Sequence, residues 1–179
     1  MAQQVIIDGY NLLGFLYAGA AGLSYAGEAA REGLLRDLSA YHAQKGHPLT
    51  VVFDGWKEGM PVERREFRSG VEVVYSRRGE RADQVIQRLA MQLGHDCAVV
   101  SSDREVADSA RRAGAFVMGA AEFAARLRIA RSGEAFPAWL AGRDRAMEAD
   151  RPRGRTEKRG NPRKLPKAVR ARQRKLRGF

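Results

Sequence analysis

The chain has 179 residues, enough for one ordinary domain and a short appendage. Hydrophobic residues make up 44% of it, which is enough for a core, and no apolar run approaches the roughly 20 residues needed to cross a bilayer. We expect a cytoplasmic protein, because the N-terminus does not look like a secretory signal. Cys97 is the only cysteine, which excludes an internal disulfide and argues against a cysteine-based zinc site.

The net charge of +11 comes from one end of the chain. Residues 151–179 contain 13 Lys and Arg and a single acid, Glu157, so this segment carries +12 and residues 1–150 carry −1. Such an asymmetry predicts an arm that binds a polyanion. We therefore divide the chain into a folded domain, residues 1–141, and a basic tail, residues 142–179, that is disordered when free and binds RNA or the ribosome. The predicted RNA-binding residues of the tail are Arg163, Lys164, Lys167, Arg170, Arg172, Arg174 and Lys175.

Strands and helices alternate along the first 130 residues. Short apolar runs predict buried strands at residues 4–8, 49–54, 71–75, 97–101 and 115–118. Helices are expected at residues 28–45, 82–93, 102–112 and 121–130, the third of them starting with a capping box formed by Ser102 and Glu105. Residues 14–27 and 55–70 are expected to be long loops. This order predicts an α/β fold, with a parallel sheet flanked by helices.

Four aspartates fall where strands end or the following helices begin. Asp8 and Asp54 end the first two predicted strands, Asp83 opens the helix after the third, and Asp103 follows the fourth. The carboxyl ends of parallel strands share one edge of the sheet, where ligands bind. Carboxylates that converge there repel one another unless a cation compensates, and the usual cation for oxygen ligands is Mg²⁺ or Mn²⁺. We predict a metal site of Asp8, Asp83 and Asp103, with Asp54 as a further candidate.

Other polar side chains flank these acids. Asn11 follows Asp8 by three residues and is placed to orient a water or a ligand oxygen. Glu80 is a candidate outer-shell acid close to Asp83. Three arginines precede Asp83 and are predicted to bind phosphate, although a solvated basic patch explains them equally well: Arg77, Arg78 and Arg81.

Each aspartate also has a structural interpretation. Asp54 stands in an Asp-Gly pair that is common in turns, and Asp8 is followed by a glycine as well. Asp83 and Asp103 fall in first helical turns, where a carboxylate is stabilised by the helix dipole. The shared sheet edge favours the functional interpretation.

Four motifs carry a resemblance to a known family. Residues 7–12 (IDGYNL), 52–55 (VFDG), 82–83 (AD) and 100–104 (VSSDR) resemble the NYN domains, a branch of the PIN-like nucleases, and in particular the bacterial YacP-like group. The resemblance covers about residues 3–130 and extends to the basic arm. It implies a PIN-like fold with a central parallel sheet.

The resemblance also implies a function. It implies Mg²⁺-dependent RNA cleavage, with metal-site roles for Asp8, Asp83 and Asp103 and support from Asn11 and Asp54. The YacP-like group includes a ribosome-associated endoribonuclease, so the implied partners are mRNA and the ribosome. Many PIN nucleases carry a further acid after the last core strand, and Glu122 is the residue found there in this chain.

The leading hypothesis is a metal-dependent endoribonuclease with the catalytic residues Asp8, Asn11, Asp83 and Asp103. The alternative is a non-catalytic RNA- or ribosome-binding protein, in which the tail acts and the acids are structural. A haloacid-dehalogenase-type phosphatase is disfavoured because Tyr10 stands where its second aspartate is required. The sequence leaves DNA open as a substrate, and it indicates neither a membrane partner nor an oligomeric state.

Overall fold

The computed structural model describes residues 3–17, 27–55 and 60–132. These residues belong to the first of two units of the chain, Met1–Glu134. The predicted tail, residues 142–179, lies outside the described residues. Within the described ranges, no helix combines the length and the apolar character that a membrane crossing requires.

A six-stranded sheet forms the centre of the fold. Its strands are β1 (Gln4–Asp8), β2 (Leu49–Phe53), β3 (Arg64–Arg68), β4 (Val71–Tyr75), β5 (Cys97–Val100) and β6 (Phe116–Met118). They lie in the order β3-β4-β2-β1-β5-β6, and every neighbouring pair is parallel except β3 and β4, which are antiparallel. Every residue of β2 and β5 is buried, as expected for interior strands covered on both faces.

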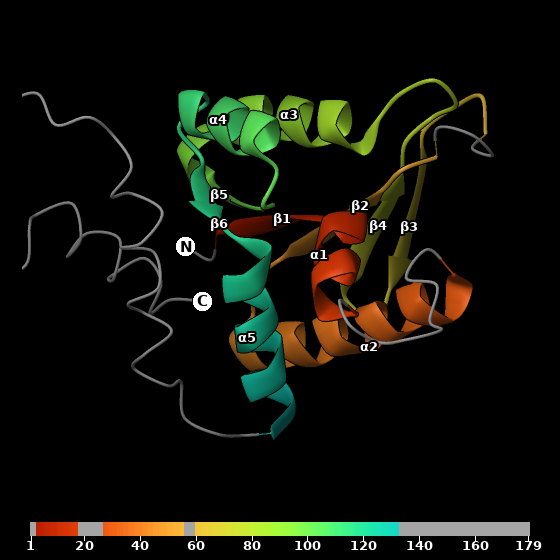
Figure 1. Cartoon of the computed structure of the whole chain (residues 1–179), viewed down its shortest axis with the longest axis vertical. Helices are drawn as coiled ribbons and strands as arrows, with labels where there is room; N and C mark the ends of the chain where they lie inside the picture. Colours follow the sequence, from red (N-terminus) through yellow and green to blue (C-terminus); the bar gives the residue numbers. More distant parts are fainter. Residues whose placement is uncertain (1–2, 18–26, 56–59, 133–179) are drawn as a thin grey trace, which may run out of the picture. The chain divides into compact units, whose positions relative to one another are not determined.

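Helices cover both faces of this sheet (Figure 1). They are α1 (Gly9–Leu16), α2 (Glu28–Lys45), α3 (Ala82–Leu93), α4 (Arg104–Arg112) and α5 (Ala120–Ser132), with a short 3₁₀ helix at Gly94–Asp96. Figure 1 shows α3 and α4 on one face and α1, α2 and α5 on the other. The α/β class and the flanking helices are therefore confirmed. The bounds of α2 and α3 are those predicted from the sequence.

Two elements were not predicted. The chain enters α1 at Gly9, directly after β1, where the sequence analysis placed no helix. β3 lies inside the region predicted to be one long loop, residues 55–70. Its sequence, RREFR, shows no apolar alternation because the strand lies at the edge of the sheet and is largely exposed. Two of its arginines form ion pairs with other elements: Arg65 with Glu72 of β4 at 3.1 Å, and Arg68 with Glu32 of α2.

The predicted capping box of α4 is wrong. The helix begins at Arg104, and Asp103 is its N-cap, with a carboxylate oxygen that accepts hydrogen bonds from the N–H groups of Glu105 (2.7 Å) and Val106 (3.2 Å). The hydroxyl oxygen of Ser102 instead accepts a hydrogen bond from the N–H of Ala120 at 3.0 Å. Ser102 therefore joins the end of β5 to the start of α5.

The order of the strands creates one point where connections diverge. β1 lies between β2 and β5, and the chain leaves β1 through α1 and α2 on one face but leaves β5 through α4 on the other. In open α/β sheets, ligands bind at such a switch point, beyond the carboxyl ends of the strands. The ends of β1 and β5 are therefore where the fold predicts a site.

We predict opposite effects for two alanine substitutions in α1. A Cβ at Gly9 would lie 2.5 Å from the Phe53 ring and 2.9 Å from the carbonyl oxygen of Val52, so Gly9→Ala should lower the free energy of unfolding by about 1–3 kcal/mol. A Cβ at Gly14 meets nothing within 4 Å, so Gly14→Ala should raise it by about 0.5–1 kcal/mol. Urea denaturation measures both, and equal effects would contradict the close approach at Gly9.

Candidate active site

Asp8 is the buried carboxylate at the end of the central strand. It is the last residue of β1 and the N-cap of α1, and only 7% of its surface is exposed. One carboxylate oxygen accepts a hydrogen bond from the N–H of Asn11 at 3.1 Å, and the other accepts one from the Ser101 hydroxyl, also at 3.1 Å. Both oxygens are therefore oriented by fixed donors.

Two hydrogen bonds join the start of α1 to the segment before α4: the one from Ser101 to Asp8 and one between Ser102 and Asn11. The hydroxyl oxygen of Ser101 accepts a hydrogen bond from the N–H of Asp103 at 3.1 Å, so one side chain contacts both Asp8 and the backbone of Asp103. The side-chain oxygen of Asn11 accepts a hydrogen bond from the N–H of Ser102 at 2.9 Å. The Asn11 amide nitrogen is thus the part of this side chain that can donate to a ligand.

The pKa of Asp8 reflects its surroundings. The pKa of Asp8 is raised from 3.8 to about 6 in total, mainly by burial, although the hydrogen bonds from Asn11 and Ser101 lower it. The charges of Asp83 and Asp103 raise it further. The three acids predicted to bind metal are therefore close enough for their charges to act on one another.

Asp83 extends this group from the neighbouring helix. It is the second residue of α3, it is half-buried, and α3 packs against α4. Burial is the largest cause of the raised pKa of Asp83, and the charge of Asp103 is the second. The charge of Arg81 lowers this pKa. Glu105 and Asp54 raise it as well. The structure thus brings Asp54 and Glu105 into the same electrostatic environment, and sequence reasoning had given Glu105 only a capping role.

These acids do not form a closed metal cage. In the parts of the chain that the structure describes, no three His, Cys, Asp or Glu side chains lie close enough together to hold a metal ion, and this includes Asp8, Asp83 and Asp103. Mg²⁺ is usually held by one or two carboxylates, several waters and substrate phosphates. An open set of carboxylates therefore suits Mg²⁺ better than Zn²⁺ or Ca²⁺. Burial is the main cause of the raised pKa values of Asp8 and Asp83, and the charges of neighbouring acids add to it, so a divalent cation nearby would favour the ionised forms.

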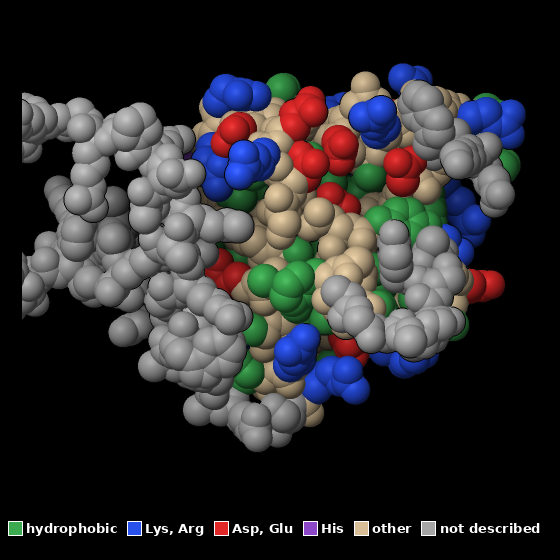
Figure 2. All heavy atoms as spheres, in the orientation of Figure 1, with side chains coloured by type: hydrophobic (Ala, Val, Ile, Leu, Met, Phe, Trp, Pro, Cys, Tyr) green, Lys and Arg blue, Asp and Glu red, His purple; other side chains and the backbone are tan. Residues whose placement is uncertain are grey.

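Basic side chains surround the acidic group (Figure 2). Acidic side chains gather between α1 and the pair formed by α3 and α4, with Lys and Arg side chains around them. Of the predicted phosphate-binding residues in the folded domain, Arg77 forms an ion pair with Glu80 at 3.3 Å, whereas Arg78 and Arg81 are exposed. The predicted basic residues of the tail, Arg163 to Lys175, lie outside the described residues.

Two further acids have partners of their own. Glu80 is buried and bound to Arg88 at 2.6 Å, so it is a paired carboxylate near the site. Glu122 is buried within α5 and pairs with Arg126 at 3.2 Å. Its carboxylate is therefore engaged inside the helix layer.

Sequence reasoning missed Ser101. It is 2% exposed and contacts both Asp8 and Asp103. The signal that could have revealed it is the predicted buried strand, residues 97–101, that ends on a serine directly before the Ser-Asp pair. A buried hydroxyl at a strand end needs hydrogen-bonding partners, and the nearest candidates were the aspartates.

Comparison with known families decides the relationship. The model of the YacP-like NYN domain matches residues 5–159, which is most of the chain. The chain belongs to the YacP-like NYN domain family. The match begins in β1 and includes Asp8, Asp54, Asp83 and Asp103, so every aspartate of the site lies within the family domain. Membership indicates a nuclease-type function related to RNA.

Bacillus subtilis has similar proteins. The "Uncharacterized protein YacP" of Bacillus subtilis (strain 168) is 29% identical over 92 residues, which are 51% of this chain and 53% of that protein, so the chain spans about half the length of this relative. The crystal structure of a point mutant of Rae1 (YacP) from Bacillus subtilis has a TM-score of 0.60 at 23% identity and covers 83% of this chain and 85% of that one. A second crystal structure of Rae1 (YacP) has a TM-score of 0.55 at 23% identity, with 82% of each chain covered. These structures share the fold of the NYN domain described above.

The raised pKa of Asp8 predicts a pH-dependent stability. Between pH 3.8 and about 6 the folded protein binds more protons at Asp8 than the unfolded chain does, so wild-type stability falls as pH rises through this range. Above this range, the ionised carboxylate of Asp8 lowers the free energy of unfolding by up to about 3 kcal/mol. The neutral side chain in Asp8→Asn does not have this effect. Metal-free urea denaturation should show Asp8→Asn gaining stability over wild type from about pH 4 to pH 7. A constant difference across that range would contradict this electrostatic account.

Proposed function

We propose that this NYN protein is a metal-dependent endoribonuclease that hydrolyses RNA phosphodiester bonds, with mRNA on the ribosome as its substrate. The observation that carries the proposal is the buried carboxylate of Asp8, whose pKa is raised by burial and by the charges of Asp83 and Asp103. A catalytic metal would offset this cost, and capping α1 does not by itself require the carboxylate to lie near two other acids.

The cofactor in this proposal is Mg²⁺, or Mn²⁺ in its place. Asp8, Asp83 and Asp103 would hold the ion, with Asp54 as a supporting acid. When bound, such an ion supplies Lewis acidity and lowers the pKa of a coordinated water, the chemistry that phosphodiester hydrolysis needs at neutral pH.

The residues of the chain hold and orient the reacting groups. Ser101 and the N–H of Asn11 fix both oxygens of Asp8. The amide nitrogen of Asn11 would donate a hydrogen bond to a phosphate oxygen, since its side-chain oxygen is already engaged by Ser102. Orientation by fixed donors contributes to catalysis because no reorganisation is needed during the reaction.

The basic residues hold the RNA. Arg78 and Arg81 are exposed beside the helix that carries Asp83, and they would contact phosphates next to the one that is cleaved. The tail, with a charge of +12 over residues 151–179, would supply affinity that does not depend on sequence. A polyanionic surface such as ribosomal RNA fits the same charge, which is the support for the ribosome as a partner.

Asp8→Asn should separate cleavage from binding. We expect Mg²⁺-dependent cleavage of a mixed RNA pool, with and without ribosomes, to fall more than about 100-fold, the scale for losing one group that stabilises the transition state. RNA affinity should be unchanged, because the basic residues are intact. The matched control is Asp108→Asn, an exposed acid of α4 that pairs with Arg111.

Other outcomes have defined meanings. Equal cleavage by wild type and Asp8→Asn would place the activity elsewhere or in a contaminant. Tight RNA binding without cleavage by either protein would favour the alternative, a non-catalytic RNA- or ribosome-binding protein.

The tail should set the salt dependence of RNA binding. Replacing Arg170, Arg172, Arg174 and Lys175 by Gln in the full chain removes four charges. Each phosphate contact on a single strand contributes about 0.7 to the slope of the logarithm of the RNA-binding constant against the logarithm of the salt concentration. Loss of four contacts should therefore make this slope shallower by up to about 3. Fluorescence anisotropy between about 50 and 300 mM salt measures this slope. An unchanged slope would show that these four residues do not contact RNA phosphates.

A further inference from the structure

Glu80 is a buried acid that the proposed reaction does not use. It lies between β4 and α3, three residues before Asp83, and 7% of its surface is exposed. One carboxylate oxygen contacts Arg88 at 2.6 Å and the other contacts Arg77 at 3.3 Å. Both oxygens of this buried carboxylate therefore have a cationic partner, although the arginine side chains themselves are partly exposed.

The backbone around Glu80 ties the ends of two strands together. The carbonyl oxygen of Glu80 accepts a hydrogen bond from the Ser76 hydroxyl at 2.7 Å. The Ser76 oxygen in turn accepts one from the N–H of Gly55 at 2.9 Å. Gly55 follows Asp54 at the end of β2, so the segment before α3 is attached to the same sheet edge as the acids.

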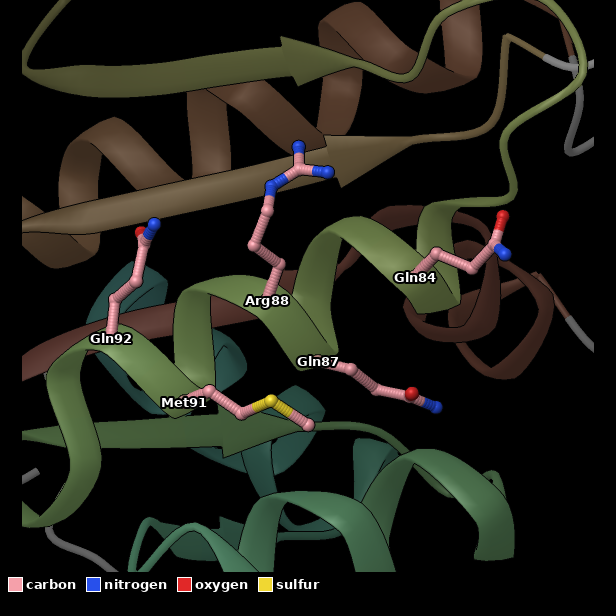
Figure 3. Close-up of a pocket in the computed structure, with 5 residues that line it drawn as sticks. All are labelled: Gln84, Gln87, Arg88, Met91 and Gln92. Carbon is pink, nitrogen blue, oxygen red and sulfur yellow. The ribbon is translucent and has the colours of Figure 1, made fainter.

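Arg88 connects this segment to the body of α3. It lies on α3 itself, and Figure 3 shows its side chain extending from the helix toward the neighbouring strands, on a surface that it shares with Gln84 and Met91. Its guanidinium contacts Glu80 and also Glu63, which precedes β3. The ion pair with Glu80 therefore links the segment that precedes α3 to the second turn of this helix.

The first turn of α3 needs such a restraint. Asp83 lies half-buried in this turn, and α3 packs against α4, whose N-cap is Asp103. Carboxylates brought together on packed helices repel one another, so contacts that hold this turn at the sheet edge are needed. A paired Glu80 provides such contacts because it is anchored both to the strand ends and to the helix.

We infer that Glu80 and Arg88 are positioning residues, an ion pair that holds the first turn of α3 so that Asp83 stays beside Asp8 and Asp103. The expected effect on metal binding rests on the proposed function. The restraint on the first turn of α3 is independent of that function. The pair acts through Asp83 and touches neither substrate nor metal.

The test compares Glu80→Gln with Glu63→Gln in the full chain. Both variants remove one carboxylate partner of Arg88, but only Glu80 leads into α3. Without metal, amide hydrogen exchange of residues 82–86 should become several-fold faster in Glu80→Gln and stay at the wild-type rate in Glu63→Gln. With Mn²⁺ as the probe, titration followed by electron paramagnetic resonance should show about 10- to 100-fold weaker binding in Glu80→Gln only.

A milder variant, Arg88→Lys, tests the same ion pair with less risk of unfolding the protein. Arg88→Lys retains the charge but not the two-pronged geometry of the guanidinium, so its exchange rates should lie between those of wild type and Glu80→Gln. Wild-type exchange in Glu80→Gln, or equal acceleration in Glu63→Gln, would overturn the inference. If the wild-type protein binds no Mn²⁺, the proposed metal function fails, while the exchange rates still decide the role of Glu80.

Discussion

Burying a carboxylate costs free energy, and the edge of this sheet is organised around one that is buried. Asp8 ends the central strand, receives two hydrogen bonds and still has a pKa raised to about 6. Asp83 and Asp103 add to the cost instead of reducing it. Hydrogen bonds alone therefore do not stabilise the ionised state fully, and a bound cation is the natural compensation.

The topology explains why these acids meet. β1 lies at the centre of the sheet and its connections diverge there, so that α1 begins directly after Asp8, while α4 begins directly after Asp103 on the other face. Both aspartates are N-caps, which uses part of each carboxylate for structure and leaves the remainder for a ligand. The structural and functional interpretations of these residues are therefore compatible, and the same side chains serve both.

Much of the fold could be predicted, because buried parallel strands and amphipathic helices leave apolar patterns. β3 could not, since RREFR is an exposed edge strand that carries no apolar pattern and is defined by its backbone pairing with β4. The cap of α4 was misplaced for a similar reason: Ser102 is engaged by Ala120, a residue 18 positions away that no local pattern reveals. At the site, the strand ends and the start of α3 could predict that these aspartates lie near one another, while their role in binding metal stays a prediction. The roles of Ser101 and Glu80 depend on tertiary hydrogen bonds and ion pairs.

The central claim is that a divalent cation binds at the carboxyl end of β1. A crystal of the full chain grown with Mn²⁺ tests it directly, because anomalous scattering locates manganese without reference to activity. The account predicts an anomalous peak within about 2–2.5 Å of an oxygen of Asp8, the range of metal–oxygen bonds, with Asp83 or Asp103 as a further ligand, directly or through water. An ordered sheet edge without a peak, or manganese bound only elsewhere, would contradict it.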